Sequence, residues 1–599
     1  MSGRKEREKT DDDKLLETWR DRWETALGAW SKFTKLHEPR WVFKEADEKK
    51  EGLSGSFAMI RLTDHTVVIS LRQIREKGLE EFATEILAHE IGHHVYAPAD
   101  LRDNARLLAR ITAGLPSMEN HAPLVSNLYT DLLINDRLQR GEGLDMSAVY
   151  SALNVESPDK LWSLYMLIYE TLWNLPPRTL NKGDTSQKTV FDAILAAKII
   201  RVYSRDWLDG AGRFAVLIAP YLDRALSKND MAALSPIMDT KNAGAGDSIP
   251  DGLATAEAQE QEGATHPSKD SALTGIGGMD GDEDGDEAKD SSAKSSPKAG
   301  GEETVGGRKN QYRDPVKYTE LMKSLGVKVS EDDLVINYYK ELARPHLIRF
   351  PEKINKQAAE PLPEGLDLWE VGDPISELDW VESSTHSPVI IPGVTTVQRT
   401  YGETEGGDPQ KQPLDLYLGI DCSGSMRNPK YGLSYPILAG TIVALSALRA
   451  KARVKATLSG EPGKYTSTDG FVKSEREIMK LLTSYLGTGY SFGVLRLKDT
   501  FIDGAKPKRP VHILIVTDND IFYMLNETKN GWEIMTEALA KAGGGGTCLL
   551  NVPSPYGTDK QIEQLQNIGW NVSLVSNEEE MVRFARQFAK LKYDKPAAK

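Results

Sequence analysis

Residues 414–421 read LDLYLGID and residues 511–517 read VHILIVT, two almost continuous apolar runs of the length of buried strands. Similar strands are expected at 453–458, 547–552 and 571–575, and helical patterns lie between the strands at 434–451, 474–486, 493–503, 530–542, 560–568 and 577–591. Apolar strands that alternate with helices predict a parallel sheet covered on both faces. We therefore assign residues 411–599 to a doubly wound, Rossmann-like α/β domain.

The first strand of this domain leads directly into Asp421, Ser423 and Ser425, a D-x-S-x-S pattern. Thr488 lies in a later Gly-Thr-Gly turn, and Asp518 follows the strand 511–517. Ligands of doubly wound sheets bind at the carboxyl ends of the strands, so these five side chains are expected together. Their oxygens are hard donors that suit Mg²⁺, with one position open to a partner's carboxylate. The alternative is ordinary Ser and Asp turn chemistry at strand ends.

A second motif lies on the helical segment 79–95, LEEFATEILAHEIGHHV. His89 and His93 are one turn apart on one face, so their imidazoles can converge on one Zn²⁺. Glu90 occupies the position of the general base in H-E-x-x-H metallopeptidases. His94 points about 100° away from His93 around the helix. The alternative is a helix whose histidines are merely hydrogen-bonded polar groups.

The third zinc ligand must come from another segment. Residues 121–140 form a helical pattern that carries Asn127 and Asp131 at i and i+4. A carboxylate binds zinc better than a carboxamide, which favours Asp131, while His121 and Glu119 are weaker candidates. The alternative role of Asp131 is to orient His89 or His93 without binding the metal.

The rest of residues 1–240 predicts a mainly helical domain with a small β element. Helical patterns cover 15–36 and 101–230, and two strand-like runs, 56–62 and 66–72, are joined by a short turn. The zinc helix follows these strands directly.

Residues 241–310 contain no Phe, Trp or Tyr, and they hold fifteen acidic and seven basic side chains. Such a composition cannot bury enough apolar surface to offset its ordering entropy, so it predicts a disordered acidic linker. Residues 311–410 are expected to be a connecting region that packs on the C-terminal domain. It has a helix from Ser330 to about Arg344 and then a stretch rich in Pro and Gly.

The composition excludes several classes of protein. The net charge of −14 argues against a nucleic-acid binder, and two cysteines exclude a disulfide framework or a cysteine-based zinc finger. The N-terminal segment lacks the apolar core of a signal peptide, and the longest apolar runs are too short to cross a membrane. We expect a cytoplasmic protein with no nucleic-acid or membrane partner.

The C-terminal features resemble a von Willebrand factor A-like domain with a metal-ion-dependent adhesion site (MIDAS) over residues 411–599. The whole chain resembles a bacterial family in which zinc-metallopeptidase-like H-E-x-x-H domains are fused to such domains. The signature of the zinc domain continues with Asn127, Asp131, Ile134 and Asn135. The resemblance implies a zincin-like fold for residues 1–240, in which an edge strand can align an extended substrate.

Relatives of this kind are often paired with a MoxR-type AAA+ ATPase, so the resemblance implies such a partner. The chain has no phosphate-binding loop of its own. Two functions remain open: a zinc-dependent peptidase whose MIDAS domain recruits a substrate or the ATPase, and a non-catalytic adaptor, similar to chelatase subunits, with a structural zinc. Glu90 distinguishes them, because a structural site has no use for that carboxylate.

Overall fold

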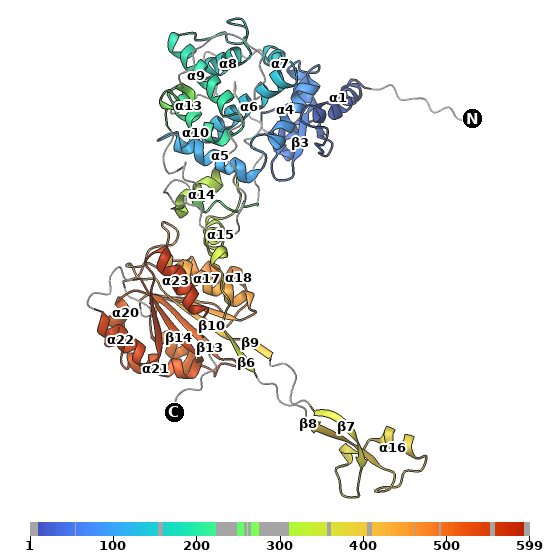
Figure 1. Cartoon of the computed structure of the whole chain (residues 1–599), viewed down its shortest axis with the longest axis vertical. Helices are drawn as coiled ribbons and strands as arrows, with labels where there is room; N and C mark the ends of the chain where they lie inside the picture. Colours follow the sequence, from blue (N-terminus) through green and yellow to red (C-terminus); the bar gives the residue numbers. More distant parts are fainter. Residues whose placement is uncertain are drawn as a thin grey trace, which may run out of the picture. The chain divides into compact units, whose positions relative to one another are not determined.

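The computed structural model describes residues 10–53, 55–153, 160–222, 248–256, 260, 265–274, 311–355, 361–403, 410–461, 463–489, 493–551 and 558–591. The chain forms two compact units, which confirms a multidomain protein (Figure 1). Unit 1 comprises Met1–Glu341 with Lys430–Leu433, and unit 2 comprises Leu342–Pro429 with Ser434–Lys599.

Unit 2 contains the expected parallel sheet. Its strands are β10 (Asp415–Asp421), β11 (Val454–Ser459), β12 (Tyr465–Ser467), β13 (Val511–Thr517), β14 (Gly543–Leu550) and β15 (Trp570–Leu574). Their order is β12-β11-β10-β13-β14-β15, and every neighbouring pair is parallel except β11–β12. All residues of β10 and β13 are buried, as their apolar sequences predict. The antiparallel edge strand β12 was not expected.

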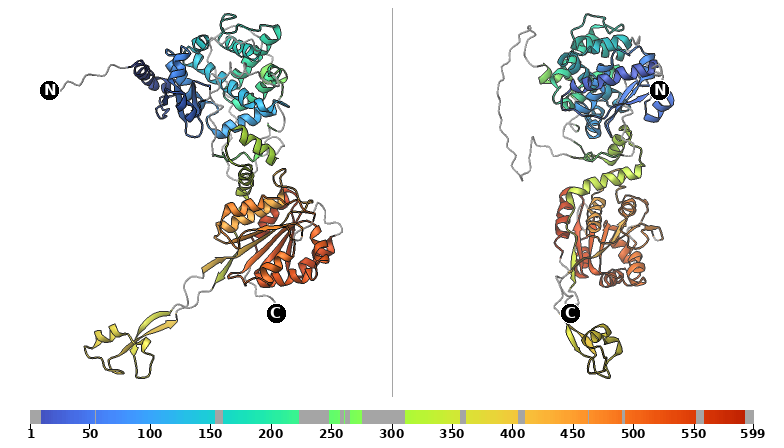
Figure 2. Two further views of the ribbon diagram at one scale, coloured as in Figure 1. Left: turned by 180° about the vertical axis from the view of Figure 1, so that it is seen from behind. Right: turned by 90° about the vertical axis from the view of Figure 1, so that its right-hand side faces the viewer.

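Helices cover both faces of this sheet (Figures 1 and 2). One face carries α17 (Tyr435–Arg449), α18 (Glu475–Leu482) and α23 (Glu578–Phe588), and the other carries α20 (Asp520–Glu527), α21 (Gly531–Ala542) and α22 (Asp559–Asn567). The segment predicted as a helix at 493–503 forms α19 (Leu495–Leu497) and a π-helical turn, Lys498–Ile502. The strand order reverses between β10 and β13, and ligands of doubly wound sheets bind at the carboxyl ends of the strands beside such a reversal.

Unit 1 is mainly helical, with a three-stranded sheet of order β1-β3-β2. Its strands are β1 (Arg40–Val42), β2 (Ala58–Arg61) and β3 (Thr66–Ser70), and β2 forms one edge. The helices are α1 (Asp11–Gly28), α2 (Glu45–Glu51), α3 (Leu71–Glu76), α4 (Ala83–Val95), α5 (Leu101–Ala113), α6 (Ala122–Gly141), α7 (Met146–Leu153), α8 (Lys160–Leu172), α9 (Gln187–Val202), α10 (Trp207–Ile218), α13 (Ser271–Thr274), α14 (Pro315–Ser324) and α15 (Glu331–Ala343). Within the described ranges, no helix combines the length and apolarity that crossing a bilayer requires.

The helix α4 is packed tightly in the core of unit 1. The indole N–H of Trp30 donates a hydrogen bond of 2.7 Å to the carbonyl of Ala88 in α4. A Cβ at Gly92 would lie 2.6 Å from Cγ2 of Ile134 in α6 and 2.6 Å from Cζ2 of Trp30. Glycine at this position therefore allows α4 to approach α6 closely.

Parts of the expected linker are ordered in unit 1, which corrects the interpretation of 241–310. In the stretches 248–256 and 265–274, Leu253 and Leu273 are buried, and Asp270 accepts a 2.5 Å hydrogen bond from the hydroxyl of Tyr203 and forms an ion pair with Arg213. A few buried or hydrogen-bonded residues hold these two short stretches in unit 1. The average composition of seventy residues does not show such local contacts. Residues 241–247, 257–259, 261–264 and 275–310 lie outside the described residues.

The expected connecting region, 311–410, is also divided differently. Residues up to Glu341 belong to unit 1, where β4 (Thr255–Ala256) pairs with β5 (Gln311–Tyr312) and Arg313 donates to the carbonyl of Leu253 at 2.9 Å. These hydrogen bonds join residues 311–341 to residues that precede them in the sequence, while residues 342–410 of the expected connecting region belong to unit 2.

Residues 361–403 form a small substructure for which the sequence suggested no elements. It consists of β7 (Pro361–Leu368), α16 (Trp380–His386) and β8 (Val397–Glu403), with β7 and β8 paired antiparallel. Two further strands, β6 (Glu352–Asn355) and β9 (Gln410–Pro413), pair antiparallel on either side of it in the sequence. We call residues 361–403 the inserted module.

The tight packing of α4 generates a stability prediction. Gly92→Ala should destabilise unit 1 by about 1–3 kcal/mol, because the added methyl group overlaps Ile134 and Trp30. Gly440→Ala in α17 is the matched control, since its Cβ would find its nearest neighbours at 3.7 Å and alanine favours a helix by about 1 kcal/mol. Calorimetry of the full-length variants measures both effects. A wild-type melting profile for Gly92→Ala would contradict the close approach of α4 and α6.

Candidate metal sites

The helices α4 and α6 bring together the three residues expected to bind a metal. Nε2 of His89 and Nε2 of His93 lie 3.8 and 3.6 Å from Oδ1 of Asp131. Within the described part of the chain, these three residues form the one group of His, Cys, Asp or Glu side chains whose ligand atoms could hold a metal ion, all within 4.8 Å of one another. His93 and Asp131 are almost fully buried, and His89 keeps 9% of its surface exposed.

The spacing of these atoms fits a small tetrahedral ion. Ligand atoms that bind such an ion at about 2.0–2.1 Å lie roughly 3.3 Å from one another. The two separations from Oδ1 of Asp131, 3.6 and 3.8 Å, are close to this value, and all three ligand atoms lie within 4.8 Å of one another. Three protein ligands leave a fourth position for water or substrate.

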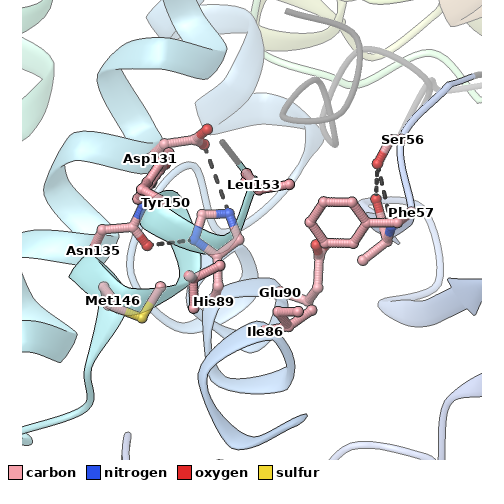
Figure 3. Close-up of a pocket in the computed structure, with 12 residues that line it drawn as sticks. Ser56, Phe57, Ile86, His89, Glu90, Asp131, Asn135, Met146, Tyr150 and Leu153 are labelled. Carbon is pink, nitrogen blue, oxygen red and sulfur yellow. Dashed lines mark hydrogen bonds and ion pairs between the residues drawn. The ribbon is translucent and has the colours of Figure 1, made fainter. Parts of the chain in front are cut away.

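The other ring nitrogen of each histidine is hydrogen-bonded, which fixes the tautomer. Nδ1 of His89 lies 2.7 Å from Oδ1 of Asn135, and Nδ1 of His93 lies 3.1 Å from the carbonyl oxygen of Ala97. Both oxygens are acceptors, so each Nδ1 carries the proton and each Nε2 presents its lone pair. Figure 3 shows His89 between Asn135 and Asp131.

A cluster of tyrosine hydroxyls fixes the orientation of Asn135. Its side-chain amide donates to the hydroxyl of Tyr150 at 3.0 Å and to that of Tyr169 at 2.8 Å, and the hydroxyl of Tyr165 lies 2.9 Å from that of Tyr169. Burial raises the pKa of Tyr165 and Tyr169 well above its usual value, so both hydroxyls stay neutral. The amide oxygen of Asn135 is thereby left to accept from His89.

Asn127 positions the third ligand. Its side-chain amide donates a 2.9 Å hydrogen bond to Oδ2 of Asp131, which leaves Oδ1 facing the histidines. This geometry favours Asp131 over Asn127 as the ligand. The supporting roles of Asn127 and Asn135 were not predicted from the sequence. The tyrosine cluster was missed altogether, and its one local signal is the i, i+4 spacing of Tyr165 and Tyr169.

The weaker ligand candidates lie outside this group. The carboxylate of Glu119 accepts from the backbone N–H of Ser117 at 3.0 Å, and His121 is buried but outside the group of ligand atoms. The ring of His94 stacks on that of His65 with 3.9 Å between the centroids. This contact agrees with the expectation that His94 points away from His93.

A small pocket opens beside the candidate ligands (Figure 3). Glu90, of which only 1% is exposed, lines it together with His89 and Asp131. The remaining lining is mostly apolar and comprises Ser56, Phe57, Ala58, Ile86, Asn135, Met146, Val149, Tyr150 and Leu153. Ala58 belongs to the edge strand β2, so a sheet edge, a carboxylate and the three candidate ligands border one hollow.

The second candidate site lies at the carboxyl end of β10. The hydroxyl of Ser425 donates to a carboxylate oxygen of Asp518, and it lies 3.0 Å from the hydroxyl of Ser423. Thr488 forms a parallel bridge with Ser423, and its carbonyl oxygen accepts from the N–H of Gly424 at 2.7 Å. The structure thus brings these residues together at the strand end where the sequence placed them.

Asp421 lies at the base of this site, almost fully buried. Its carboxylate accepts from the backbone N–H of Ser423 at 2.8 Å and from the hydroxyl of Thr517 at 2.7 Å. Burial and the nearby charge of Asp518 raise the pKa of Asp421 to about 7. Two buried carboxylates and the hydroxyls of Ser423 and Ser425 form an oxygen-rich set that suits a hard divalent cation. The hydroxyl of Thr488 is instead engaged by the backbone N–H of Glu461, which donates to it at 3.1 Å.

The position of Asn135 predicts an effect on metal affinity without loss of a ligand. Asn135→Ala removes the acceptor that orients His89, so affinity for Zn²⁺ should fall about 10- to 100-fold. Asn104→Ala, on the neighbouring helix α5, should bind Zn²⁺ as the wild type does. Titration of full-length protein against a chromophoric chelator measures both constants. If Asp131→Ala keeps wild-type affinity and Asn127→Ala loses it, the third ligand is wrongly assigned.

The raised pKa of Asp421 predicts a stability effect that depends on pH. The folded state binds the proton of the Asp421 carboxyl more tightly than the unfolded state does. The protonated carboxyl therefore adds its full contribution to the free energy of unfolding below pH 3.8, and this contribution is lost as the pH rises through 7. The loss amounts to roughly 4 kcal/mol at about 1.4 kcal/mol per pKa unit. Urea unfolding of the wild type and of Asp421→Asn in EDTA, from pH 4 to 8, measures this loss as the difference between their free energies of unfolding. Added Mg²⁺ should restore stability at pH 8 in the wild type alone. Parallel curves for the two proteins would contradict the assignment.

No family model, no curated protein and no solved structure matches this chain.

Proposed function

We propose that the chain is a zinc-dependent metallopeptidase-like protein whose second unit, a von Willebrand factor A-like domain, binds Mg²⁺ and recruits a partner. One observation carries the proposal. His89, His93 and Asp131 converge with their ligand atoms within 4.8 Å, and Glu90 lines the same pocket. The helical core and the edge strand β2 support a zincin-like assignment of unit 1.

The donor set favours zinc over a harder cation, because two of its three ligand atoms are imidazole nitrogens. When bound, zinc acts as a Lewis acid and lowers the pKa of a coordinated water. Glu90 contributes the carboxylate that accepts a proton from the attacking water and delivers it to the leaving amine. An extended peptide can pair with the edge strand β2 and lie along the pocket.

Glu90→Gln is the variant that tests hydrolysis. Peptidase activity on unfolded casein should fall by at least about 100-fold, because the proton acceptor is lost. Zinc content, measured by mass spectrometry, should stay at the wild-type value, whereas His89→Ala should lose zinc. Glu85→Gln, on the same helix but outside the pocket lining, is the matched control and should keep full activity.

The alternative function is a non-catalytic adaptor with a structural zinc, similar to chelatase subunits. It predicts that wild type and Glu90→Gln bind zinc equally and show the same background activity. The presence of a carboxylate in the pocket beside the ligands favours the peptidase, since a structural site needs no such group.

The site at the end of β10 supports the assignment of a MIDAS. In this proposal Asp421, Ser423, Ser425, Thr488 and Asp518 would supply oxygen ligands, some of them through water, and would leave a position for a partner's carboxylate. A MoxR-type AAA+ ATPase is the proposed partner. The chain has no phosphate-binding loop, so work on a stable substrate must draw on ATP that another protein hydrolyses.

Recruitment of the ATPase is expected to depend on Mg²⁺. Asp421→Ala should weaken binding to a MoxR-type ATPase at least tenfold, about 1.4 kcal/mol, and EDTA should weaken wild-type binding equally. Asp469→Ala, an exposed carboxylate in the same unit, should bind as the wild type does. Zinc content should not change in either variant. Undiminished binding in a pull-down with Asp421→Ala or with EDTA would show that the contact lies elsewhere.

A further inference from the structure

The inserted module, residues 361–403, has a small interior of its own. Trp369 is 8% exposed, and its carbonyl accepts a 2.8 Å hydrogen bond from the buried hydroxyl of Thr396. The indole N–H of Trp369 donates to the carbonyl of Pro374 at 3.1 Å. Asp379 caps α16 by accepting from the N–H groups of Val381 and Glu382. These contacts give the module a defined shape around a very small core.

Most of the module's large apolar side chains lie on its surface. Among the described residues, 23 large hydrophobic side chains are exposed, and eleven of them belong to this short segment: Leu366, Leu368, Val371, Ile375, Trp380, Val381, Val389, Ile390, Ile391, Val394 and Tyr401. Val371 and Val381 are more than 70% exposed. Such a concentration of exposed apolar surface is rare on a monomer and is typical of an interaction site.

The register of β7 and β8 gathers part of this surface on one face. Leu366 pairs with Arg399, Leu368 pairs with Val397, and Tyr401 follows Arg399 by two residues. These side chains therefore share a face of the two-stranded ribbon, because paired residues point to the same side and residues two apart do as well. Elsewhere in the module, the side chain of Val371 lies close to Gly393. A Cβ added at Gly393 would be 3.7 Å from Cγ2 of Val371.

The charge of the module restricts what can cover this surface. It carries eight carboxylates, Glu364, Asp367, Glu370, Asp373, Glu377, Asp379, Glu382 and Glu403, against one guanidinium. That guanidinium, on Arg399, is paired with Asp379 at 2.7 Å. The net charge of −7 repels a second copy of the module, an anionic membrane and a nucleic acid, and it attracts a cationic surface.

We propose that the inserted module is a docking surface for a partner protein that presents a basic segment with apolar side chains. Trp380 and Tyr401 are the expected anchors, since large aromatic side chains dominate binding energy at protein interfaces. The surrounding carboxylates steer the basic segment and set the salt dependence. This inference does not depend on either metal site.

The test uses a fluorescein-labelled, 18-residue helical peptide of Lys and Leu, with the Leu residues on one face, and the full-length protein. Fluorescence anisotropy should show binding that weakens as salt is raised. The triple variant Val371→Ser, Trp380→Ser, Tyr401→Ser should bind at least tenfold more weakly. Phe33→Ser, Phe191→Ser, Val202→Ser replaces three exposed apolar side chains of unit 1 and should leave binding unchanged. If the triple variant misfolds by circular dichroism, Val371→Ser alone replaces it, because that side chain is 78% exposed.

Two companion peptides separate charge from apolar contact. A peptide with Glu in place of Lys should not bind, and one with Ser in place of Leu should bind at least tenfold more weakly. Equal binding of the Lys/Ser peptide, or equal binding by the triple variant, would overturn the proposal. So would a wild-type dimer that the triple variant loses in sedimentation, or binding to phosphatidylcholine vesicles that it loses in flotation.

Discussion

The close approach of α4 to α6 is the constraint on which the first site depends. At Gly92 a single methyl group would overlap both Ile134 and Trp30. The indole of Trp30 also donates a hydrogen bond to the carbonyl of Ala88 in α4. Two histidines on a helix define a face but not a site. The site arises because Gly92 lets α6 lie close to α4, which brings Asp131 of α6 near the two histidines. Asn135 and Ile134 belong to the same helix.

The two candidate sites solve the problem of buried polar groups in different ways. In unit 1, each candidate ligand side chain is held by a hydrogen bond at its other polar atom. The partners are Asn135 for His89, the carbonyl of Ala97 for His93 and Asn127 for Asp131. In unit 2, the carboxylates of Asp421 and Asp518 lie at the ends of the neighbouring strands β10 and β13, and burial together with the charge of Asp518 raises the pKa of Asp421. The first arrangement is held in place by hydrogen bonds alone, while in the second a bound cation would offset the repulsion between the carboxylates.

The sequence predicted the features that depend on local periodicity. They include the α/β alternation of unit 2, the helix of His89 and His93, the position of Asp131 beside these histidines, and that of Asp421 beside Ser423. The tyrosine cluster could not be predicted, because it depends on how α7 and α8 pack against α6. The ordered anchors near Leu253 and Asp270 were hidden by an average composition. The inserted module was missed because its strands contain Pro and Gly and its helix has only two turns.

The pairing of β6 with β9 has a consequence for how this chain can change. Glu352 pairs with Pro413 and Asn355 with Gln410, so the chain leaves and re-enters at adjacent points of one antiparallel pair before it continues into β10. Everything between these strands is topologically a loop. The segment between them can therefore be lengthened, replaced or deleted while the register of β10 with β11 and β13 stays the same. Natural variation can thus alter the exposed surface of the inserted module without disturbing the carboxyl end of β10.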